Sequence, residues 1–227
     1  MNPFELIIFD CDGVLVDSEH ITINVLTTLL NEMGIVVTAD EIYGRFHGRS
    51  STQWLAQIAE ILGEPLPETF FPTLRQRAAV ALWEQVTPID GIVETLDTIQ
   101  TPVCVASSGD PDKMALTLGR TGLLPRFGEK VYSVRDVQRP KPFPDIYLHA
   151  ARENGVRPSQ CAVIEDSPTG VLAAVTAGMF VFGYCADTPQ QQLQHAGAQV
   201  LFADMRQLPL LLAWTTIKQN KTAVFSA

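Results

Sequence analysis

The sequence predicts an α/β protein with a Rossmann-like parallel sheet and an α-helical cap domain inserted after the first strand. Two patterns carry this prediction. In the second half of the chain, short apolar runs alternate with helical stretches, which is typical of a parallel sheet with helical crossovers. Nearer the N-terminus, the long segment 18–84 shows apolar residues at helical spacing and no convincing strand.

Six apolar runs predict the strands of the sheet. Strands covered by helices on both faces read as continuous apolar runs rather than as alternating ones. The expected strands are 5–9, 102–107, 130–134, 161–164, 179–184 and 199–202. The helices expected between the later strands are 112–122, 144–153, 168–177 and 189–196. This alternation of strand and helix predicts right-handed crossovers.

The segment between the first two strands is predicted to be helical. Residues 23–33 and 54–62 carry apolar side chains at helical spacing, and the whole segment is too long for a loop. Pro88 and Gly91 provide turn chemistry where the chain returns to the sheet. We therefore divide the chain into an α/β core domain, residues 1–14 and 88–227, and a helical cap domain, residues 15–87.

Length and charge exclude several classes of protein. With 227 residues, of which 46% are hydrophobic and 18% charged, the chain can bury a sizeable core and is a poor candidate for disorder or a coiled coil. Its 16 Lys and Arg against 25 Asp and Glu give a net charge of −9. Nucleic-acid binding uses a basic surplus, so we expect no nucleic acid and no anionic membrane as partner. No secretory or membrane-spanning segment is recognisable, and we expect a cytoplasmic monomer.

Polar residues follow four of the expected strands. Ligands of open α/β sheets bind at the carboxyl ends of the strands, so these positions are the candidate site. They are Asp10 and Asp12 after the first strand, Ser107 and Ser108 after the second, Lys141 after the third, and Glu165 and Asp166 after the fourth.

The carboxylates of this set predict a bound cation. Two like charges about 4 Å apart repel by about 4 kcal/mol at an effective dielectric constant of 20, and one lysine does not offset four such groups. Mg²⁺ binds through one or two carboxylates together with phosphate oxygens of a substrate. The sequence therefore predicts a metal-assisted phosphate site.

The same residues resemble the four ordered motifs of the haloacid dehalogenase superfamily. The matching segments are Asp10-Cys11-Asp12-Gly13-Val14, Ser107, Lys141 within Arg-Pro-Lys-Pro-Phe-Pro-Asp, and Glu165-Asp166-Ser167-Pro168-Thr169-Gly170. The resemblance is strongest to the branch with a helical cap after the first strand, which includes β-phosphoglucomutases and sugar-phosphate phosphatases.

This resemblance implies a role for each residue. Asp10 would be the nucleophile that forms an aspartyl-phosphate, and Asp12 would first protonate the leaving oxygen and then activate water. Ser107, Ser108 and Lys141 would bind the phosphoryl group. Mg²⁺ would be held by Asp10, the carbonyl of Asp12, Glu165 and Asp166. Arg49, within the cap segment 47–51, would contact the leaving group.

The function we expect is Mg²⁺-dependent hydrolysis of a small phosphorylated metabolite, a sugar or sugar-acid phosphate such as 6-phosphogluconate. Asp12 argues against dehalogenation, because dehalogenases of this superfamily lack the second aspartate. A mutase of the β-phosphoglucomutase type is the first alternative, although Thr22 stands where that mutase has its hinge histidine. The second alternative, a phospho-accepting receiver module, carries its acidic pair before the phosphorylated aspartate and has no helical insertion.

Overall fold

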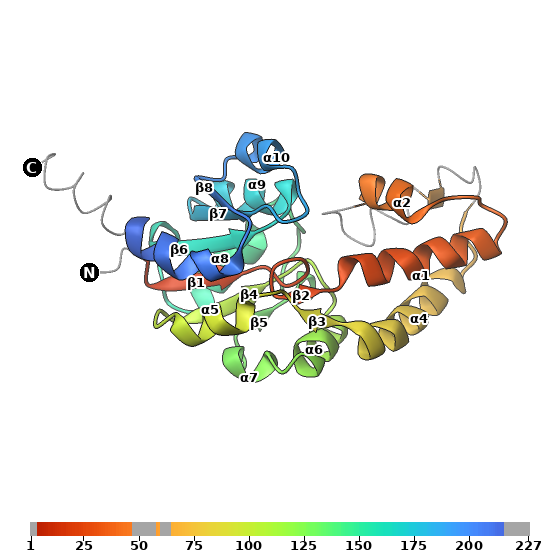
Figure 1. Cartoon of the computed structure of the whole chain (residues 1–227), viewed down its shortest axis with the longest axis horizontal. Helices are drawn as coiled ribbons and strands as arrows, with labels where there is room; N and C mark the ends of the chain where they lie inside the picture. The colour runs from red at the N-terminus through yellow and green to blue at the C-terminus, as the bar shows by residue number, and fades with distance from the viewer. Residues whose placement is uncertain (1–3, 47–57, 60–64, 216–227) are drawn as a thin grey trace, which may run out of the picture.

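The computed structural model describes residues 4–46, 58–59 and 65–215, and it confirms the predicted fold class. Its main sheet in this part of the chain has six parallel strands in the order β5-β4-β1-β6-β7-β8 (Figure 1). Five of the six runs singled out in the sequence contain one of these strands, and the run 161–164 matches the remaining strand except that the strand extends to Glu165. The six strands are β1 (Leu6–Phe9), β4 (Val103–Ala106), β5 (Val131–Tyr132), β6 (Cys161–Glu165), β7 (Phe180–Tyr184) and β8 (Val200–Phe202).

Helices cover both faces of the sheet. The four expected crossover helices are α6 (Pro111–Arg120), α8 (Asp145–Glu153), α9 (Pro168–Thr176) and α10 (Gln190–Ala196). Two further short helices, α5 (Ile92–Thr98) and α7 (Leu124–Phe127), were not expected from the sequence. Each of them spans too few residues for an apolar period to stand out. Their buried apolar side chains, Ile92 and Leu96 of α5 and Phe127 of α7, pack against the core.

Alternation along β1 divides the core into two layers. Ile7 and Phe9 pack on one face with α5, α6 and α7, whereas Leu6 and Ile8 pack on the other with α8 and α9. All four side chains are completely buried. Successive side chains of a strand point to opposite faces, so a continuous apolar run is what a strand between two helical layers requires.

The order of the strands decides where a ligand would bind. The chain runs from β1 outward to β4 and β5, then crosses to β6 on the other side of β1. The order reverses beside β1, and in doubly wound sheets ligands bind outside the carboxyl ends of the strands at such a switch point. Residues that follow β1, β4 and β6 are therefore neighbours.

The segment after β1 forms a separate helical layer. Helices α1 (Glu19–Glu32), α2 (Ala39–Phe46) and α4 (Phe70–Gln85) extend to one side of the sheet (Figure 1). They enclose their own apolar cluster, which includes Leu26, Leu30 and Leu74. A short antiparallel pair, β2 (Val16–Asp17) with β3 (Thr87–Pro88), carries the chain out and back. We propose that the core and cap domains divide at this pair.

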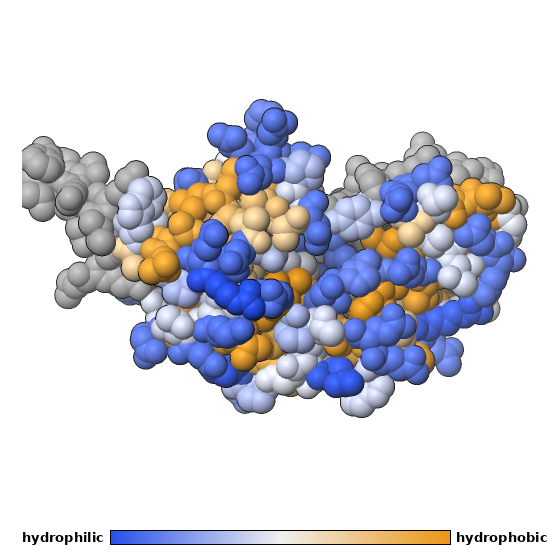
Figure 2. Space-filling model, in the orientation of Figure 1, coloured by the Kyte–Doolittle hydropathy of each residue, from blue (hydrophilic) through white to orange (hydrophobic). Residues whose placement is uncertain are grey.

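Hydrophilic side chains cover much of the face shown in Figure 2, over cap and core alike, with apolar ones between them. Among the described helices, none combines the length and the hydropathy needed to cross a membrane.

Candidate active site

The structure brings the strand-end residues together. Asp10 follows β1, Ser107 follows β4, and Glu165 ends β6 just before Asp166. The backbone N–H of Asp10 donates to the carbonyl of Ile164 at 3.0 Å, so the chain stays paired with β6 up to the first carboxylate. Asp10, Ser107, Glu165 and Asp166 are all at most 8% exposed.

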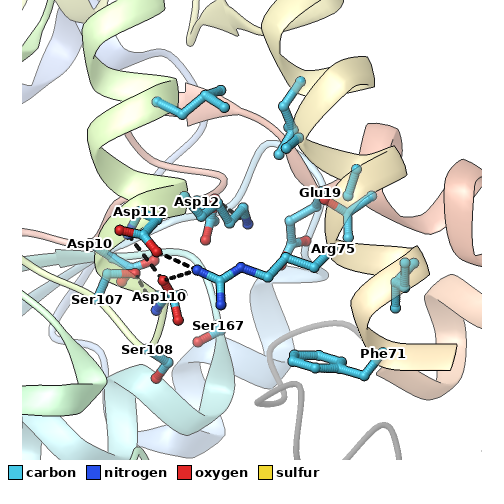
Figure 3. A pocket seen from close by; sticks show the side chains of 18 of the residues that line it. Asp10, Asp12, Glu19, Phe71, Arg75, Ser107, Ser108, Asp110, Asp112 and Ser167 are labelled. Carbon is cyan, nitrogen blue, oxygen red and sulfur yellow. Dashed lines mark hydrogen bonds and ion pairs between the residues drawn. The ribbon is translucent and has the colours of Figure 1, made fainter. Parts of the chain in front are cut away.

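Asp10, Ser107 and Asp166 line a cavity of about 290 Å³ between the sheet and the cap (Figure 3), and Glu165 lies beside it. From the core it is lined by Asp10, Asp12, Ser107, Ser108, Lys141 and Asp166, among others. From the cap, α4 contributes a largely apolar wall with Phe71 and Leu74, interrupted by Arg75. The structure thus places all of the candidate residues in or beside one site, except Arg49, which lies outside the described residues.

Lys141 joins two carboxylates at the floor of the site. Its Nζ atom lies 2.6 Å from Asp10 Oδ1 and 2.7 Å from Glu165 Oε1, and all three side chains are nearly or fully buried. Burial raises the pKa of Asp10 to about 7, against the opposing effect of the Lys141 charge. Burial acts on Glu165 in the same direction, but Lys141 and further hydrogen bonds lower its pKa. Glu165 is therefore ionised, and it anchors the lysine.

The rest of the Glu165 carboxylate is enclosed by hydrogen-bond donors. The hydroxyl of Tyr147 donates to Oε1 at 2.8 Å, and the backbone N–H and hydroxyl of Ser167 donate to Oε2 at 2.9 and 3.0 Å. A Cβ atom on Gly170 would collide with this carboxylate. The motif from Glu165 to Gly170 is thus explained by packing, because the glycine leaves room for the acid.

Asp12 has different surroundings from those of Asp10. Its Oδ1 atom lies 2.8 Å from Lys113 Nζ and also accepts a hydrogen bond from the hydroxyl of Ser18. Burial opposes ionisation of Asp12, but Lys113 and Ser18 outweigh it, so the pKa of Asp12 lies below its usual value. Asp12 is therefore held as a carboxylate.

Three carboxylates can hold a metal ion. Asp10, Glu165 and Asp166 each offer an oxygen, and these oxygens lie within 4.8 Å of one another. Burial, followed by the charges of Glu19 and Glu165, raises the pKa of Asp166 well above its usual range, so its environment is short of positive charge. Gly13 adopts φ 76°, and a Cβ atom there would collide with Asp166. An oxygen-only donor set of this kind fits Mg²⁺.

Two arginines, one from α4 and one from the segment after β5, pair with the same aspartate at the start of α6. Asp110 caps this helix, since its side chain accepts from the N–H of Asp112 at 3.0 Å. Arg75 of the cap pairs with Asp110 at 3.2 Å and also with Asp112 (Figure 3), while Arg135 pairs with Asp110 at 2.5 Å. Arg75 thus links α4 to the core at the edge of the cavity.

Three residues of the site were not predicted as site residues from the sequence: Lys113, Tyr147 and Arg75. A signal existed only for Lys113, which is a cation in the first turn of a helix, where the helix dipole disfavours positive charge. Tyr147 and Arg75 carry no local signal, because their roles depend on partners far away in the sequence. Tyr147 of α8 reaches Glu165, and Arg75 of α4 reaches the start of α6.

Comparisons with known proteins agree with this geometry. A family model described as haloacid dehalogenase-like hydrolase matches residues 7–184. The 6-phosphogluconate phosphatase of Escherichia coli (strain K12) is 32% identical over 212 residues, covering 93% of this chain and 96% of that protein.

Two solved structures show the same fold. A conserved haloacid dehalogenase-like protein of unknown function from Agrobacterium tumefaciens superposes with a TM-score of 0.83 at 36% identity, covering 93% of this chain and 99% of that one. A beta-phosphoglucomutase-like protein from Thermotoga maritima superposes with a TM-score of 0.76 at 25% identity, covering 92% and 99%. The part of this chain that superposes on these structures thus includes both the sheet and the helical cap.

Proposed function

This chain belongs to the haloacid dehalogenase-like hydrolases and is a phosphatase, and we propose that it hydrolyses a phosphorylated sugar or sugar acid with Mg²⁺ through a phosphate ester of Asp10. One observation carries the proposal. A single cavity is lined by a buried carboxylate beside a lysine, a second carboxylate two residues on, and a buried serine, namely Asp10 with Lys141, then Asp12, then Ser107.

In the first step, a carboxylate oxygen of Asp10 attacks the phosphorus atom of the substrate. A new oxygen–phosphorus bond forms, the bond from phosphorus to the leaving oxygen breaks, and Asp12 gives its proton to that oxygen, which departs as an alcohol. Asp12 is ionised in the substrate-free protein. The negative charge of a bound phosphate ester raises its affinity for a proton, so it can enter this step as the acid.

In the second step, Asp12 acts as the base. Its carboxylate takes a proton from water while the water oxygen bonds to phosphorus, and the bond between phosphorus and Asp10 breaks. Inorganic phosphate leaves, and Asp10 is again a carboxylate. Asp12 then releases its proton to water and takes one up again when the next phosphate ester binds. One group serves first as acid and then as base, as two-step transfer requires.

The phosphoryl group is held by residues at the strand ends. Lys141 is buried against Asp10 and would carry positive charge close to the transferred oxygens. Ser107 and Ser108 line the cavity beside it and would donate hydrogen bonds. Arg49 would contact the leaving group, as the resemblance implies.

The metal site of this proposal consists of Asp10, Asp166, the backbone carbonyl of Asp12, and Glu165. When bound, Mg²⁺ would neutralise charge on the carboxylates and on the phosphate and fix them relative to one another. Glu165 would have to exchange one of its hydrogen bonds to bind the ion, since both of its oxygens already accept from Lys141, Tyr147 or Ser167.

We also propose a substrate class, the partners and a location. Similarity to a 6-phosphogluconate phosphatase, with a cavity of about 290 Å³, favours a small phosphorylated sugar or sugar acid. The net charge of −9 argues against nucleic acid. The cavity is built within one chain, which suits a monomer. The four cysteines are buried and free, as is usual in the reducing cytoplasm.

The mutase is the alternative that a specific observation keeps open, because a beta-phosphoglucomutase-like structure is among the similar folds. A mutase must protect its phosphoenzyme from water until a second sugar hydroxyl arrives. Thr22 lines the cavity, but its hydroxyl donates to the carbonyl of Ser18 at 3.2 Å and cannot gate proton transfer as an imidazole does. The receiver alternative has no support from the Escherichia coli relative, because that protein is a phosphatase.

The test is release of phosphate from a panel of phosphorylated sugars and sugar acids, with Mg²⁺ or with a chelator. We expect phosphate to appear with Mg²⁺, no release with the chelator, and no turnover by folded Asp10→Asn. Following the sugar phosphates by NMR separates the two enzymes. Conversion of β-glucose-1-phosphate to glucose-6-phosphate faster than any phosphate release would establish the mutase instead.

A further inference from the structure

Lys113 pairs with the proposed acid and base, Asp12, from a helix that carries none of the family motifs. The two side chains are 27% and 17% exposed, and Lys113 Nζ lies 2.8 Å from Asp12 Oδ1. Lys113 also lines the cavity. The pair therefore lies at the reacting end of the site and is mostly withdrawn from water.

The position of Lys113 opposes the local preference of its helix. It is the third residue of α6, where the exposed N–H groups make the helix end positive and favour anions. Asp110 and Asp112 satisfy that preference, and Arg75 and Arg135 already neutralise them. Helix stability thus gives no reason for a lysine here, and its partner Asp12 does.

The two carboxylate oxygens of Asp12 have different contacts. Both Lys113 and Ser18 reach Oδ1. The other oxygen, Oδ2, faces the phosphate-binding end: a Cβ atom placed on Gly109 would lie 3.5 Å from Asp12 Oδ2 and 3.3 Å from Ser107 Oγ. With Oδ1 fixed by two donors, Oδ2 is the oxygen left to exchange a proton with the substrate.

We propose that Lys113 is a positioning residue that fixes Asp12 Oδ1 and so aims Oδ2 at the leaving oxygen. This inference rests on the proposed phosphatase reaction. It differs from two simpler roles. A lysine that only stabilised the fold would affect all substrates equally, and a lysine that bound the phosphoryl group would weaken the binding of every phosphate.

The test compares two leaving groups. The leaving group of a sugar phosphate is an alkoxide, which needs the proton of Asp12. The leaving group of p-nitrophenyl phosphate is a stable phenolate, which does not need that proton. The value of kcat/KM reports the first chemical step for both. For Lys113→Met we expect kcat/KM to fall at least about 10-fold with the sugar phosphate and less than about 3-fold with p-nitrophenyl phosphate, because general acid catalysis contributes about 10²–10⁴-fold.

Three further variants and one inhibition measurement sharpen the comparison. Lys113→Arg, which keeps a donor near Oδ1, should recover part of the loss. Lys130→Met, a change at an exposed lysine of the same domain, should match the wild type. The inhibition constant of inorganic phosphate should be unchanged in Lys113→Met. Ser18→Ala removes the other donor to Oδ1 and should show the same selective loss to a smaller extent, which keeps the proposal testable if Lys113→Met does not fold.

Several outcomes overturn the proposal. An equal fall with both substrates would indicate a structural role, weaker inhibition by phosphate would indicate phosphate binding, and an unchanged or increased kcat/KM with the sugar phosphate would show that Asp12 needs no positioning by Lys113. A wild-type protein that hydrolyses neither substrate would instead contradict the proposed function itself.

Discussion

Asp10 and Asp12 are the same amino acid two positions apart, and their surroundings make them chemically different. Asp10 is buried against Lys141 with a pKa of about 7, while Lys113 and Ser18 hold the pKa of Asp12 below its usual value. Without a metal ion, Asp10 holds a proton more tightly than Asp12 does. A bound Mg²⁺ would lower the pKa of Asp10 and leave it the anionic nucleophile, while Asp12 stays free to carry the proton. Their spacing of two residues explains why Asp10 and Asp12 lie close together, and their different neighbouring side chains explain why their pKa values differ.

The glycine that accommodates Glu165 gives a test at the scale of one methyl group. Gly170→Ala places a Cβ atom against the Glu165 carboxylate, which anchors Lys141. We expect a loss of about 1–3 kcal/mol in unfolding free energy from overpacking, together with at least a 10-fold fall in kcat. Thermal unfolding and phosphate release measure the two effects.

The matched control for this variant is Gly119→Ala. Gly119 lies inside α6, and a Cβ atom there would meet no other atom within 4 Å. Alanine should stabilise this helix by about 0.5–1 kcal/mol with no change in kcat. If Gly170→Ala behaved like Gly119→Ala, the account of the Glu165 pocket would be wrong.

At the scale of elements, the strands were predictable from the sequence. The short helices α5 and α7 and the long-range contacts of Lys113 and Tyr147 were not. The buried strands β1, β4 and β6 read as apolar runs, and the polar residues after them marked the site. The short α5 and α7 were missed because their few apolar contacts define no period. Lys113 and Tyr147 were missed because their partners, Asp12 and Glu165, are distant in sequence and are met only through packing.

The link between α4 and α6 predicts how the cap affects catalysis. Arg75 is the cap residue that reaches Asp110 and Asp112 over the cavity. An exposed ion pair contributes only about 0–1 kcal/mol to stability, so Arg75→Ala should barely change the melting temperature. It should raise KM for a sugar phosphate several-fold, because the cap is held less firmly over the bound substrate.

Arg77→Ala is the control on the same helix. Arg77 pairs with Glu32 at 2.7 Å inside the cap and does not cross to the core. Its KM should equal that of the wild type. Equal KM values for Arg75→Ala and Arg77→Ala would show that the bridge to α6 has no part in substrate binding.

At the scale of the whole molecule, metal binding should stabilise the fold. A ligand present at about 100 times its dissociation constant adds about 2.7 kcal/mol, which for a chain of this length raises the melting temperature by roughly 5–10 °C. We expect Mg²⁺ to do this for the wild type but much less for Asp166→Asn. A variant at an exposed carboxylate far from the site, Asp97→Asn, should respond like the wild type.

The size of this stabilisation should depend on pH. Burial raises the pKa values of Asp10, to about 7, and of Asp166. Below pH 7, Asp10 of the folded, metal-free protein therefore holds a proton that Mg²⁺ must displace. Above pH 7, Asp10 is ionised, which destabilises the metal-free fold and favours the ion. The shift in melting temperature should be larger at pH 8 than at pH 6. An equal or reversed dependence would argue against these carboxylates as ligands.

The most direct test of the central claim is a single-turnover burst with folded Asp12→Asn protein and p-nitrophenyl phosphate in the presence of Mg²⁺. The leaving phenolate needs no proton, so Asp10 should still be phosphorylated, but without Asp12 as base the phosphoenzyme should persist. We predict one equivalent of p-nitrophenolate per protein and, by mass spectrometry, one phosphoryl group on Asp10. A folded protein that gives no burst, or that carries the phosphoryl group on another residue such as Ser107, would contradict the account.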